Sequence, residues 1–368
     1  MSACIGSGFG EGQLLIDANF ALWHRPSTSR RFPITSSKIR VGILGAGAMG
    51  AEHAFSYGSI DAVEVAGVFS RNLARAEAIT QRSNATAVTD AFALIDDPAI
   101  DAIDVCVPSI NHREYVVAAL RRGKHVFCET PFALRLDHAD AMIEAARASK
   151  KVLLVGLLIR SIAAYEQVHQ IAESGELGRV LSVTAYRLGS YLRTDAPDHK
   201  EHYSEPSTEL MTFDFDFVQW LLGRPARVTA AAAGSARGGP GEISALLEYD
   251  DGRSATVLAS GIMPSCFPFS VGFRVVLERG AFEHGLVVEA GEFKVTFVRY
   301  PERGSAEQVS LPNRNPYEQE LRLFADCIVG KADPALLAPE RAREALTLSI
   351  ATQQSLREHR GIDPRSIR

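Results

Sequence analysis

The sequence predicts an α/β plus α+β protein, with a doubly wound parallel sheet in its first half and a large, open, mostly antiparallel sheet in its second half. In the first half, apolar runs rich in β-branched residues alternate with helical patterns, as expected for a parallel sheet that is buried on both faces. After about residue 160, short alternating runs follow one another with turn signals such as Asp250-Asp251-Gly252, which indicate antiparallel strands. A chain of 368 residues is long enough for two such domains.

The parallel sheet is expected to begin with an apolar strand at Ile39, which runs into a glycine-rich turn and then a helix. Further strands are predicted at residues 63–69, 102–107, 125–128 and 152–157, and helices at residues 73–82, 112–122 and 137–150. This alternation predicts that the helices cover both faces of the sheet.

The second half opens with one helical pattern and then becomes rich in strands. The helix is predicted at residues 163–174, the strands at 180–187, 227–233, 243–249, 254–260, 273–278 and 293–298, and two closing helices at 316–329 and 339–358. We therefore expect a tail at residues 1–37, a first domain at 38–157 and a second at 158–368, whose last helices pack back on the first domain.

The tail contains Arg30-Arg31, which resembles the start of a twin-arginine export signal. No apolar segment follows this pair, and Pro33 and a Thr-Ser-Ser run lead directly into the first strand. We interpret residues 1–37 as a tail rather than a signal peptide.

The overall composition is that of a globular protein, with 46% hydrophobic and 23% charged residues. A net charge of −5 and a pI near 6.1 argue against nucleic acid as a partner. No apolar run approaches the length of a membrane span. The five cysteines form no C-x-x-C pair, so we expect reduced thiols in a cytoplasmic protein and no metal site.

The first turn carries the clearest functional signal. The strand from Ile39 runs into Gly45-Ala46-Gly47-Ala48-Met49-Gly50, a G-x-G-x-x-G pattern with a helix behind it. Gly45 allows the tight turn, Gly47 lets the backbone approach a pyrophosphate, and Gly50 lets the helix pack closely on the strand. The amino end of the helix then attracts the phosphates. This stretch, including Ala48 and Met49, predicts a dinucleotide site in a Rossmann domain.

The end of the second strand bears on the choice of dinucleotide. Folds that prefer NAD place an acidic residue there, which binds the ribose hydroxyls. This chain has Ser70-Arg71-Asn72, with Arg75 one turn later. The missing carboxylate and the added guanidinium favour the 2′-phosphate of NADP(H). NAD bound through other contacts, with Arg71 in solvent, is the alternative.

With these motifs the chain resembles the Gfo/Idh/MocA oxidoreductases from about residue 38 to residue 361. The resemblance rests on the glycine loop and on several further segments, which include Pro108-Ser109-Ile110-Asn111-His112, Gly123 to Pro131, Gly156 to Arg160, Gly175 to Gly178, and Asp216 with Trp220-Leu221-Leu222-Gly223. It implies a Rossmann domain joined to an open antiparallel sheet, and NAD(P)-dependent chemistry on sugars or cyclic polyols. It also implies that Pro108, Asn111, His112, Glu129, Thr130 and Pro131 lie around the nicotinamide, and that dimers or tetramers form through the sheet.

Two departures from the family pattern concern the proton. Glu129-Thr130-Pro131 stands where the family usually has Glu-Lys-Pro, and Phe213 stands where it often has a histidine four residues after an acid, here Glu209. A threonine ionises far too weakly to replace the lysine as a base. Hydride transfer needs a proton donor or acceptor, so this chain must use another one.

The replacement candidates lie on the next site segments. We select Glu209, Asp216, Thr130 and His202 as catalytic candidates, and Arg160, Asp216 and Tyr191 as substrate-binding candidates. The plainer alternatives are a structural ion pair for Arg160, a helix-start charge for Asp216, a core or capping role for His112, and a solvated polar loop at residues 191–203. Pro131 is expected to follow a cis peptide bond.

Three functions remain open at this point. The first is a dissociating NADP(H)-dependent oxidoreductase that acts on a sugar-like alcohol or ketone. The second is a redox-neutral, glycosidase-type enzyme that keeps its cofactor bound, since such relatives vary the same lysine. The third is a non-catalytic member that binds a ligand.

Overall fold

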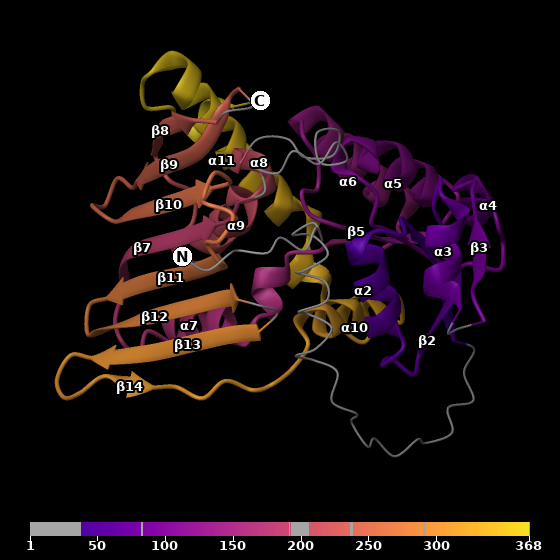
Figure 1. Ribbon diagram of the computed structural model, residues 1–368, viewed down its shortest axis with the longest axis horizontal. Helices are drawn as coiled ribbons and strands as arrows, with labels where there is room; N and C mark the ends of the chain where they lie inside the picture. Colours follow the sequence, from indigo (N-terminus) through magenta and orange to yellow (C-terminus); the bar gives the residue numbers. More distant parts are fainter. Residues whose placement is uncertain are drawn as a thin grey trace, which may run out of the picture.

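The structure is a computed structural model that describes residues 38–81, 84–190, 192, 206–235, 238–289 and 292–367. Two β-sheets lie side by side in it, one in the first half of the chain and one in the second (Figure 1). The sequence-predicted fold class, a Rossmann sheet followed by a larger and mostly antiparallel sheet, is confirmed.

The first sheet has six parallel strands in the order β3-β2-β1-β4-β5-β6. Its strands are β1 (Ile39–Leu44), β2 (Val63–Phe69), β3 (Thr86–Val88), β4 (Ala102–Val105), β5 (His125–Cys128) and β6 (Leu153–Val155). The strand order reverses between β1 and β4, because the chain continues from β1 to β2 on one side and returns to β4 on the other. Ligands of such sheets bind at this point, beyond the carboxyl ends of the strands.

Helices cover the first sheet and bury its apolar residues. They are α2 (Ala48–Tyr57), α3 (Leu73–Thr80), α4 (Phe92–Ile95), α5 (His112–Arg121) and α6 (Leu136–Ser149), with a 3₁₀ turn η1 at Ser109–Asn111. Residues such as Ile43, Val105 and Phe127 are fully buried in the resulting core. Each strand is short and almost entirely apolar, as expected where both faces of the sheet are covered.

The second sheet has eight strands in the order β14-β13-β12-β11-β7-β10-β9-β8. They are β7 (Val180–Leu188), β8 (Arg227–Gly234), β9 (Pro240–Glu248), β10 (Ser254–Ser260), β11 (Phe269–Leu277), β12 (Gly280–Glu289), β13 (Glu292–Pro301) and β14 (Glu307–Gln308). All neighbours are antiparallel except β7 and β10, which run parallel at the centre.

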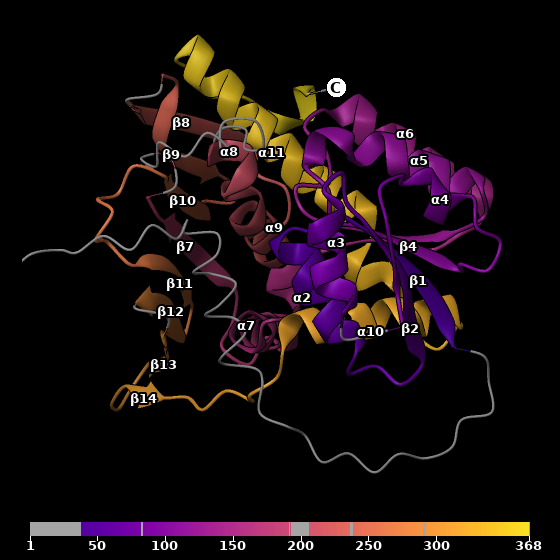
Figure 2. The same ribbon diagram turned by 45° about the vertical axis from the view of Figure 1, so that its right-hand side comes forward.

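Helices lie on only one face of this larger sheet (Figure 2). They are η2 (Leu158–Ser161), α7 (Ala163–Ser174), α8 (Pro206–Glu209), α9 (Met211–Leu222) and α11 (Pro339–Glu358). The covered face holds a second core around Phe215, Phe217 and Phe273. The other face is left uncovered by helices of the described chain (Figure 2).

Two late helices connect the halves. α10 (Pro316–Ile328) packs against α2, and its Leu321 and Phe324 belong to the first core. α11 contacts both α6 of the first half and α9 of the second. The connecting turns η4 (Pro334–Leu337) and η5 (Pro364–Ser366) complete the fold.

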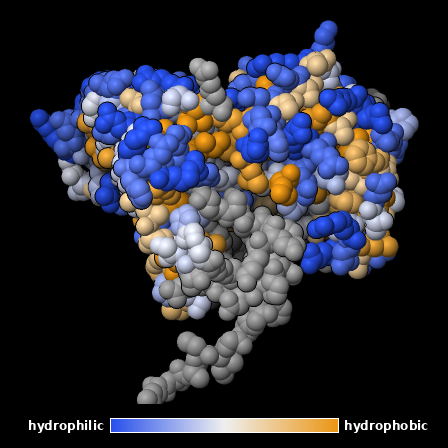
Figure 3. All heavy atoms as spheres, turned by 90° about the horizontal axis from the view of Figure 1, so that it is seen from above, coloured by the Kyte–Doolittle hydropathy of each residue, from blue (hydrophilic) through white to orange (hydrophobic). Residues whose placement is uncertain are grey.

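Some elements differ from those that the sequence predicted. β12 was not predicted, because Gly280, His284 and Gly285 interrupt its apolar alternation; the strand forms through pairing with β11 and β13. Short β3 and β14 were not predicted either. In the described part of the chain, no helix is long and apolar enough to cross a membrane. Hydrophilic residues cover most of the surface seen from above, with smaller hydrophobic groups between them (Figure 3).

Candidate active site

The carboxyl edge of the parallel sheet gathers the segments that the sequence singled out. Ladder bonds extend past the strand ends: Cys106 donates its N–H to Leu44, Glu129 to Val105 and Gly156 to Cys128, at 2.8, 3.0 and 2.9 Å. The glycine loop, the turn at Pro108, the turn at Glu129 and the start of the second half therefore lie along one edge.

The glycine loop has the shape that a dinucleotide requires. Gly45 has φ +123°, and a Cβ there would lie 2.5 Å from the carbonyl oxygen of Cys106. A Cβ on Gly50 would lie 1.9 Å from the carbonyl oxygen of Gly45, so the helix can approach the strand only with glycine there. Gly47 has no heavy atom within 4 Å of that position among the described residues, which leaves its outer side open.

The amino end of α2 is free to receive phosphate. No side chain caps it, and its first turn holds no acidic residue. The unpaired N–H groups around Ala48, Met49 and Gly50 and the helix dipole thus face the loop without competition from a carboxylate. These residues fit a dinucleotide pyrophosphate.

The end of β2 carries positive charge, as the sequence predicted. Ser70 donates its N–H to Val88 at 3.0 Å, and its hydroxyl accepts the N–H of Asn72 at 3.2 Å, which fixes the turn. Arg71 and Arg75 are exposed, and neither forms an ion pair with a carboxylate within the described ranges. Both guanidinium groups are available to an anionic ligand at this corner.

The turn after β5 is tightly held. The Thr130–Pro131 peptide bond is cis, as predicted. Glu129 accepts the N–H of Thr130 on Oε2 at 2.9 Å, and the Thr130 hydroxyl donates to the carbonyl oxygen of Gly156 at 2.7 Å. The hydroxyl is thus engaged in joining this turn to the end of β6, which leaves Thr130 unsuited to proton transfer.

His112 supports the edge from behind. Its side chain is buried, its Nε2 lies 2.7 Å from the carbonyl oxygen of Val107, and its Nδ1 lies 3.2 Å from that of Phe132. Burial lowers the pKa of this imidazole. The ring therefore joins the Pro108 turn to the Pro131 turn, whereas Pro108, just before η1, and Asn111, at its end, are partly exposed.

Arg160 and Asp216 lie together, but they face each other. Arg160 donates Nε to Oδ2 and Nη2 to Oδ1 of Asp216, at 2.9 and 2.8 Å, and both side chains are at least 96% buried. The indole of Trp220 covers the Arg160 guanidinium at 4.9 Å. The structure therefore corresponds to the plainer alternative, a structural ion pair, and neither charge is presented to a substrate in this arrangement.

A second arginine, Arg187, pairs with another aspartate of α9 and was not among the predicted site residues. Arg187 of β7 stacks on the ring of Phe213 at 4.7 Å and pairs with Asp214 at 3.3 Å. Burial raises the pKa of the Asp214 carboxyl, although Arg187 opposes the rise. Phe213, at the position where the resembled family often has a histidine, thus packs against Arg187. The two residues are 26 positions apart, so no local sequence pattern indicates this contact.

The remaining catalytic candidates are only partly described. Glu209 is half-buried at the end of α8, directly before α9. His202 and Tyr191 lie outside the described residues, as does the tail at 1–37.

Sequence reasoning also missed a buried chain of charged groups behind this edge, formed by Asp104, His53 and Glu129. An aspartate in the middle of an apolar strand was the available signal, because a buried carboxylate needs a partner.

Two family models match the chain. The model described as "Oxidoreductase family, NAD-binding Rossmann fold" matches residues 39–157, and the model described as "GFO/IDH/MocA C-terminal domain" matches residues 165–283. Together they cover the Rossmann sheet and the larger sheet from β7 to the start of β12.

Relatives and solved structures agree with these matches. The chain is 24% identical over 345 residues to a myo-inositol 2-dehydrogenase of Thermotoga maritima, which covers 88% of this chain and 98% of that protein. It is 26% identical over 228 residues to a 2,7-anhydro-N-acetylneuraminate hydratase of Escherichia coli, which covers 60% of this chain and 61% of that protein. A levoglucosan dehydrogenase in complex with NADH and levoglucosan shares the fold, with a TM-score of 0.72 at 19% identity over 89% of this chain and 99% of that one.

Proposed function

The chain belongs to the Gfo/Idh/MocA family of NAD(P)-dependent oxidoreductases, and we propose that it transfers a hydride between the nicotinamide and a carbinol carbon of a sugar-like or cyclic polyol. The observation that carries the proposal is the open glycine loop at the uncapped amino end of α2, on the same edge as the Glu129–Pro131 turn. An intact dinucleotide cradle favours this reaction over a non-catalytic member of the family.

NADP(H) is the favoured form of the cofactor. Ser70 and Arg71 follow β2 where an NAD-preferring domain has a carboxylate. Arg71 and Arg75 can pair with a 2′-phosphate, and no acidic side chain at the strand end repels it.

The chain's own residues have three tasks in this reaction. The amides of the glycine loop hold the pyrophosphate, and the turn around Pro131 borders the nicotinamide, which supplies or accepts the hydride when bound. Glu209 or His202 takes the hydroxyl proton during oxidation and returns it during reduction. Arg187 is always charged and cannot accept a proton, but it can stabilise negative charge that develops on the carbinol oxygen.

The class of substrate follows from the relatives. Their names point to cyclic polyols and anhydrosugars, namely myo-inositol, levoglucosan and 2,7-anhydro-N-acetylneuraminate. Myo-inositol and levoglucosan both offer ring hydroxyl groups next to one another, and we expect such a ring in the substrate of this chain.

The proposal is tested with cofactor-free protein. We would titrate it with NADPH and, separately, with NADH while following the nicotinamide fluorescence, and then screen the two oxidised cofactors against a panel of cyclic polyols and anhydrosugars. Reversible binding that favours NADPH, with absorbance growth at 340 nm on at least one polyol, is the expected result. Binding without turnover on the whole panel would instead support a ligand-binding protein.

A redox-neutral reaction is the second candidate. Two observations favour it: Thr130 replaces the family lysine and donates its hydroxyl to Gly156, and one relative is named a hydratase rather than a dehydrogenase. In that case the cofactor stays bound through the whole cycle. Cofactor that copurifies and does not exchange with added NADPH would support this candidate over the first.

Two further expectations concern the setting of the enzyme. We propose a homodimer or homotetramer that forms through the uncovered face of the large sheet, where Leu246 and Tyr300 are exposed. We also propose a cytoplasmic location, because Cys106, Cys128, Cys266 and Cys327 are free thiols.

A further inference from the structure

A buried chain of three charged groups lies directly behind the carboxyl edge of the parallel sheet. His53 of α2 places Nδ1 at 2.8 Å from Oδ2 of Asp104, on β4, and Nε2 at 2.8 Å from Oε1 of Glu129, after β5. The side chains of His53 and Asp104 are fully buried, and that of Glu129 is 12% exposed. The phosphate-binding helix, the central strand and the turn beside the nicotinamide site are thus joined through one imidazole.

The two carboxylates favour a doubly protonated ring, although only the Nδ1–Asp104 contact has the alignment of a hydrogen bond and the Nε2–Glu129 contact is an ion pair by distance. A neutral imidazole has one N–H and can donate to only one carboxylate, whereas the imidazolium donates from both nitrogens. Burial on its own lowers the pKa of His53, but Asp104 and Cys106 together outweigh it, and the pKa lies well above the ordinary value. The imidazolium forms a charge-assisted hydrogen bond with Asp104 and an ion pair with Glu129.

The same chain fixes the turn that carries the cis bond. Oε2 of Glu129 accepts the N–H of Thr130, so one carboxylate holds the imidazolium with one oxygen and its own turn with the other. Gly156 packs on this carboxylate, since a Cβ there would lie 3.2 Å from Oε2. A shift of His53 therefore moves Glu129, and with it Thr130 and Pro131.

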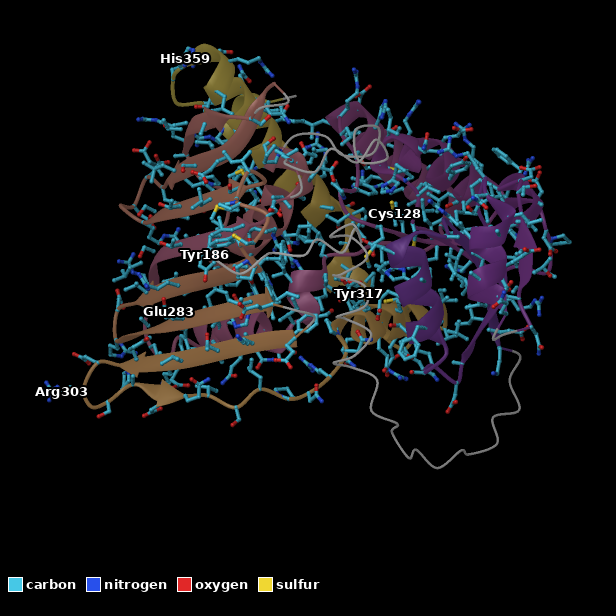
Figure 4. The ribbon with its side chains drawn as sticks, viewed as in Figure 1. Cys128, Tyr186, Glu283, Arg303, Tyr317 and His359 are labelled. Atoms are coloured by element: carbon cyan, nitrogen blue, oxygen red, sulfur yellow. The ribbon has the colours of Figure 1, made fainter. Side chains whose placement is uncertain are left out.

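α10 packs against His53 and Glu129 and adds a third buried carboxyl group there. Glu320 is fully buried, and its two oxygens have no hydrogen-bond partner among the described residues. One of its oxygens lies within 4.8 Å of both His53 Nε2 and a Glu129 oxygen. Burial, followed by the Glu129 charge, raises the pKa of Glu320 well above its ordinary value and so favours the neutral carboxyl. Figure 4 labels Tyr317 of the same helix, near the Cys128 end of β5.

The same atoms also form two possible donor sets for a metal ion, His53-Asp104-Cys106 and His53-Glu129-Glu320. A ligating histidine must present a lone pair, and both nitrogens of His53 already face carboxylate oxygens at hydrogen-bond distance. Burial raises the pKa of Cys106, which keeps its sulfur protonated. The geometry therefore favours a proton-bearing imidazolium over a metal.

We propose that His53 is a positioning residue for hydride transfer. Its imidazolium locks the Glu129–Pro131 turn to α2, the helix that holds the pyrophosphate, and so sets where the nicotinamide lies relative to the turn. This inference rests on the proposed function. The phosphate and adenine contacts lie elsewhere, at the glycine loop and at Arg71, so His53 affects the rate of the hydride step and leaves the affinity for NADPH almost unchanged.

The kinetic test uses His53→Gln, with His284→Gln as the matched control. His284 is also a buried histidine, but it lies in β12 and faces the carbonyl oxygen of Thr296 at 2.9 Å. On a polyol that the wild type oxidises, we expect kcat of His53→Gln to fall about 10- to 100-fold, while the Kd for NADPH stays within about threefold. We expect the control to keep both values. A parallel loss of NADPH affinity, or an unchanged kcat, overturns the proposal.

A spectroscopic test on the wild type holds even if His53→Gln does not fold. In protein labelled with ¹⁵N-histidine at pH 8, His53 should show protons on both nitrogens, whereas an ordinary histidine is neutral there. The groups that face the ring are Asp104 of β4, Cys106 after it, Glu129 after β5, and Glu320 and Tyr317 of α10; Tyr57 of α2 faces Asp104. Asp104→Asn should abolish the signal, and Glu320→Gln should preserve it and the activity.

The possible failures are distinguishable. A wild type that does not bind NADPH contradicts the proposed function and says nothing against the imidazolium signal. A wild type that turns over polyol but shows a neutral His53 ring contradicts this inference alone. Bound metal in purified protein, detected by elemental analysis and lost in Glu320→Gln, would replace the imidazolium with a metal site.

Discussion

Thr130 donates its hydroxyl hydrogen to the carbonyl oxygen of Gly156 at 2.7 Å, across the carboxyl ends of β5 and β6. The family pattern that this chain resembles leads us to expect a proton-transferring lysine at the Thr130 position. In this chain the same position links two neighbouring segments of the sheet edge. The substitution therefore removes a base and adds a structural bond.

The contribution of the Thr130–Gly156 hydrogen bond to stability can be measured with Thr130→Val. The valine keeps the shape of the side chain but leaves the buried Gly156 carbonyl without its donor, so we expect a loss of about 1–2 kcal/mol in the free energy of unfolding. Thr256→Val on the exposed face of β10 is the control and should change stability by less than about 0.5 kcal/mol. Chemical denaturation of the three proteins decides; equal stabilities would show that the bond contributes nothing.

Arg71 decides the cofactor preference in our proposal. Arg71→Ala should weaken NADPH binding about 10- to 100-fold, because a charge-assisted bond to the 2′-phosphate is lost, and should leave NADH binding within about twofold. Arg303→Ala, at the far tip of the large sheet, is the matched control (Figure 4). Fluorescence titration gives both constants, and an equal loss for the two cofactors would argue against a 2′-phosphate contact.

The two interpretations of Arg160 and Asp216, a buried ion pair or a substrate contact, lead to opposite predictions for Asp216→Asn. As a buried ion pair, Asp216→Asn leaves the guanidinium uncompensated and should cost about 3–5 kcal/mol of unfolding free energy. As a substrate contact, the same change would raise KM at nearly unchanged stability. Denaturation and steady-state kinetics on one preparation separate the two, and the double variant Arg160→Met/Asp216→Leu should recover part of the lost stability.

How much the sequence predicted depends on how local each feature is. The Gly45–Gly50 loop was predictable because its glycine spacing, the strand before it and the helix after it all lie within one short segment of the sequence. The cation at Arg71 was predictable for the same reason, since the end of β2 is fixed by the strand before it. The cis bond before Pro131 was expected from the motif that surrounds it.

Features that depend on distant partners were not predictable. His53 and Asp104 are 51 residues apart, and nothing in either segment indicates the other. β12 contains glycines that weaken its own strand signal, and its neighbours β11 and β13 stabilise it. Arg160 and Asp216 were both selected as site residues, but their bidentate pairing appears only when η2 and α9 are placed together.

The uncovered face of the large sheet leads to a prediction about assembly. Leu246 is 43% exposed in the middle of β9, and a stable dimer through this face would bury it. Leu246→Arg should therefore shift the molecular mass toward the monomer, because a charge in a buried interface core is costly. Leu336→Arg, an equally simple change at a leucine that is 37% exposed on η4, should leave the mass unchanged. Light scattering after size exclusion measures both; a mass unaffected by Leu246→Arg would exclude this surface as the contact.

The pH dependence of stability tests the buried carboxyl on α10. Glu320 has a folded-state pKa well above the ordinary value, because burial and the Glu129 charge disfavour its carboxylate. Above a pH of about 4.3 the unfolded chain has lost this proton while the folded chain keeps it. The free energy of unfolding therefore falls as the pH rises toward the folded-state pKa, by at most about 1.4 kcal/mol per pH unit.

Glu320→Gln is neutral at every pH and lacks this term, so its stability relative to the wild type should increase with pH. The window from about pH 5.0 to 6.2 isolates the effect, because below the ordinary histidine pKa of about 6.5 the stabilisation from His53 is fully present. Asp214 titrates equally in both proteins and cancels in the difference. Glu318→Gln, on the outer side of α10 in a pair with Arg322, is the control and should show no such trend. Parallel stability curves for Glu320→Gln and the wild type would mean that Glu320 is ionised in the folded protein, and the imidazolium of His53 would then face three carboxylates instead of two.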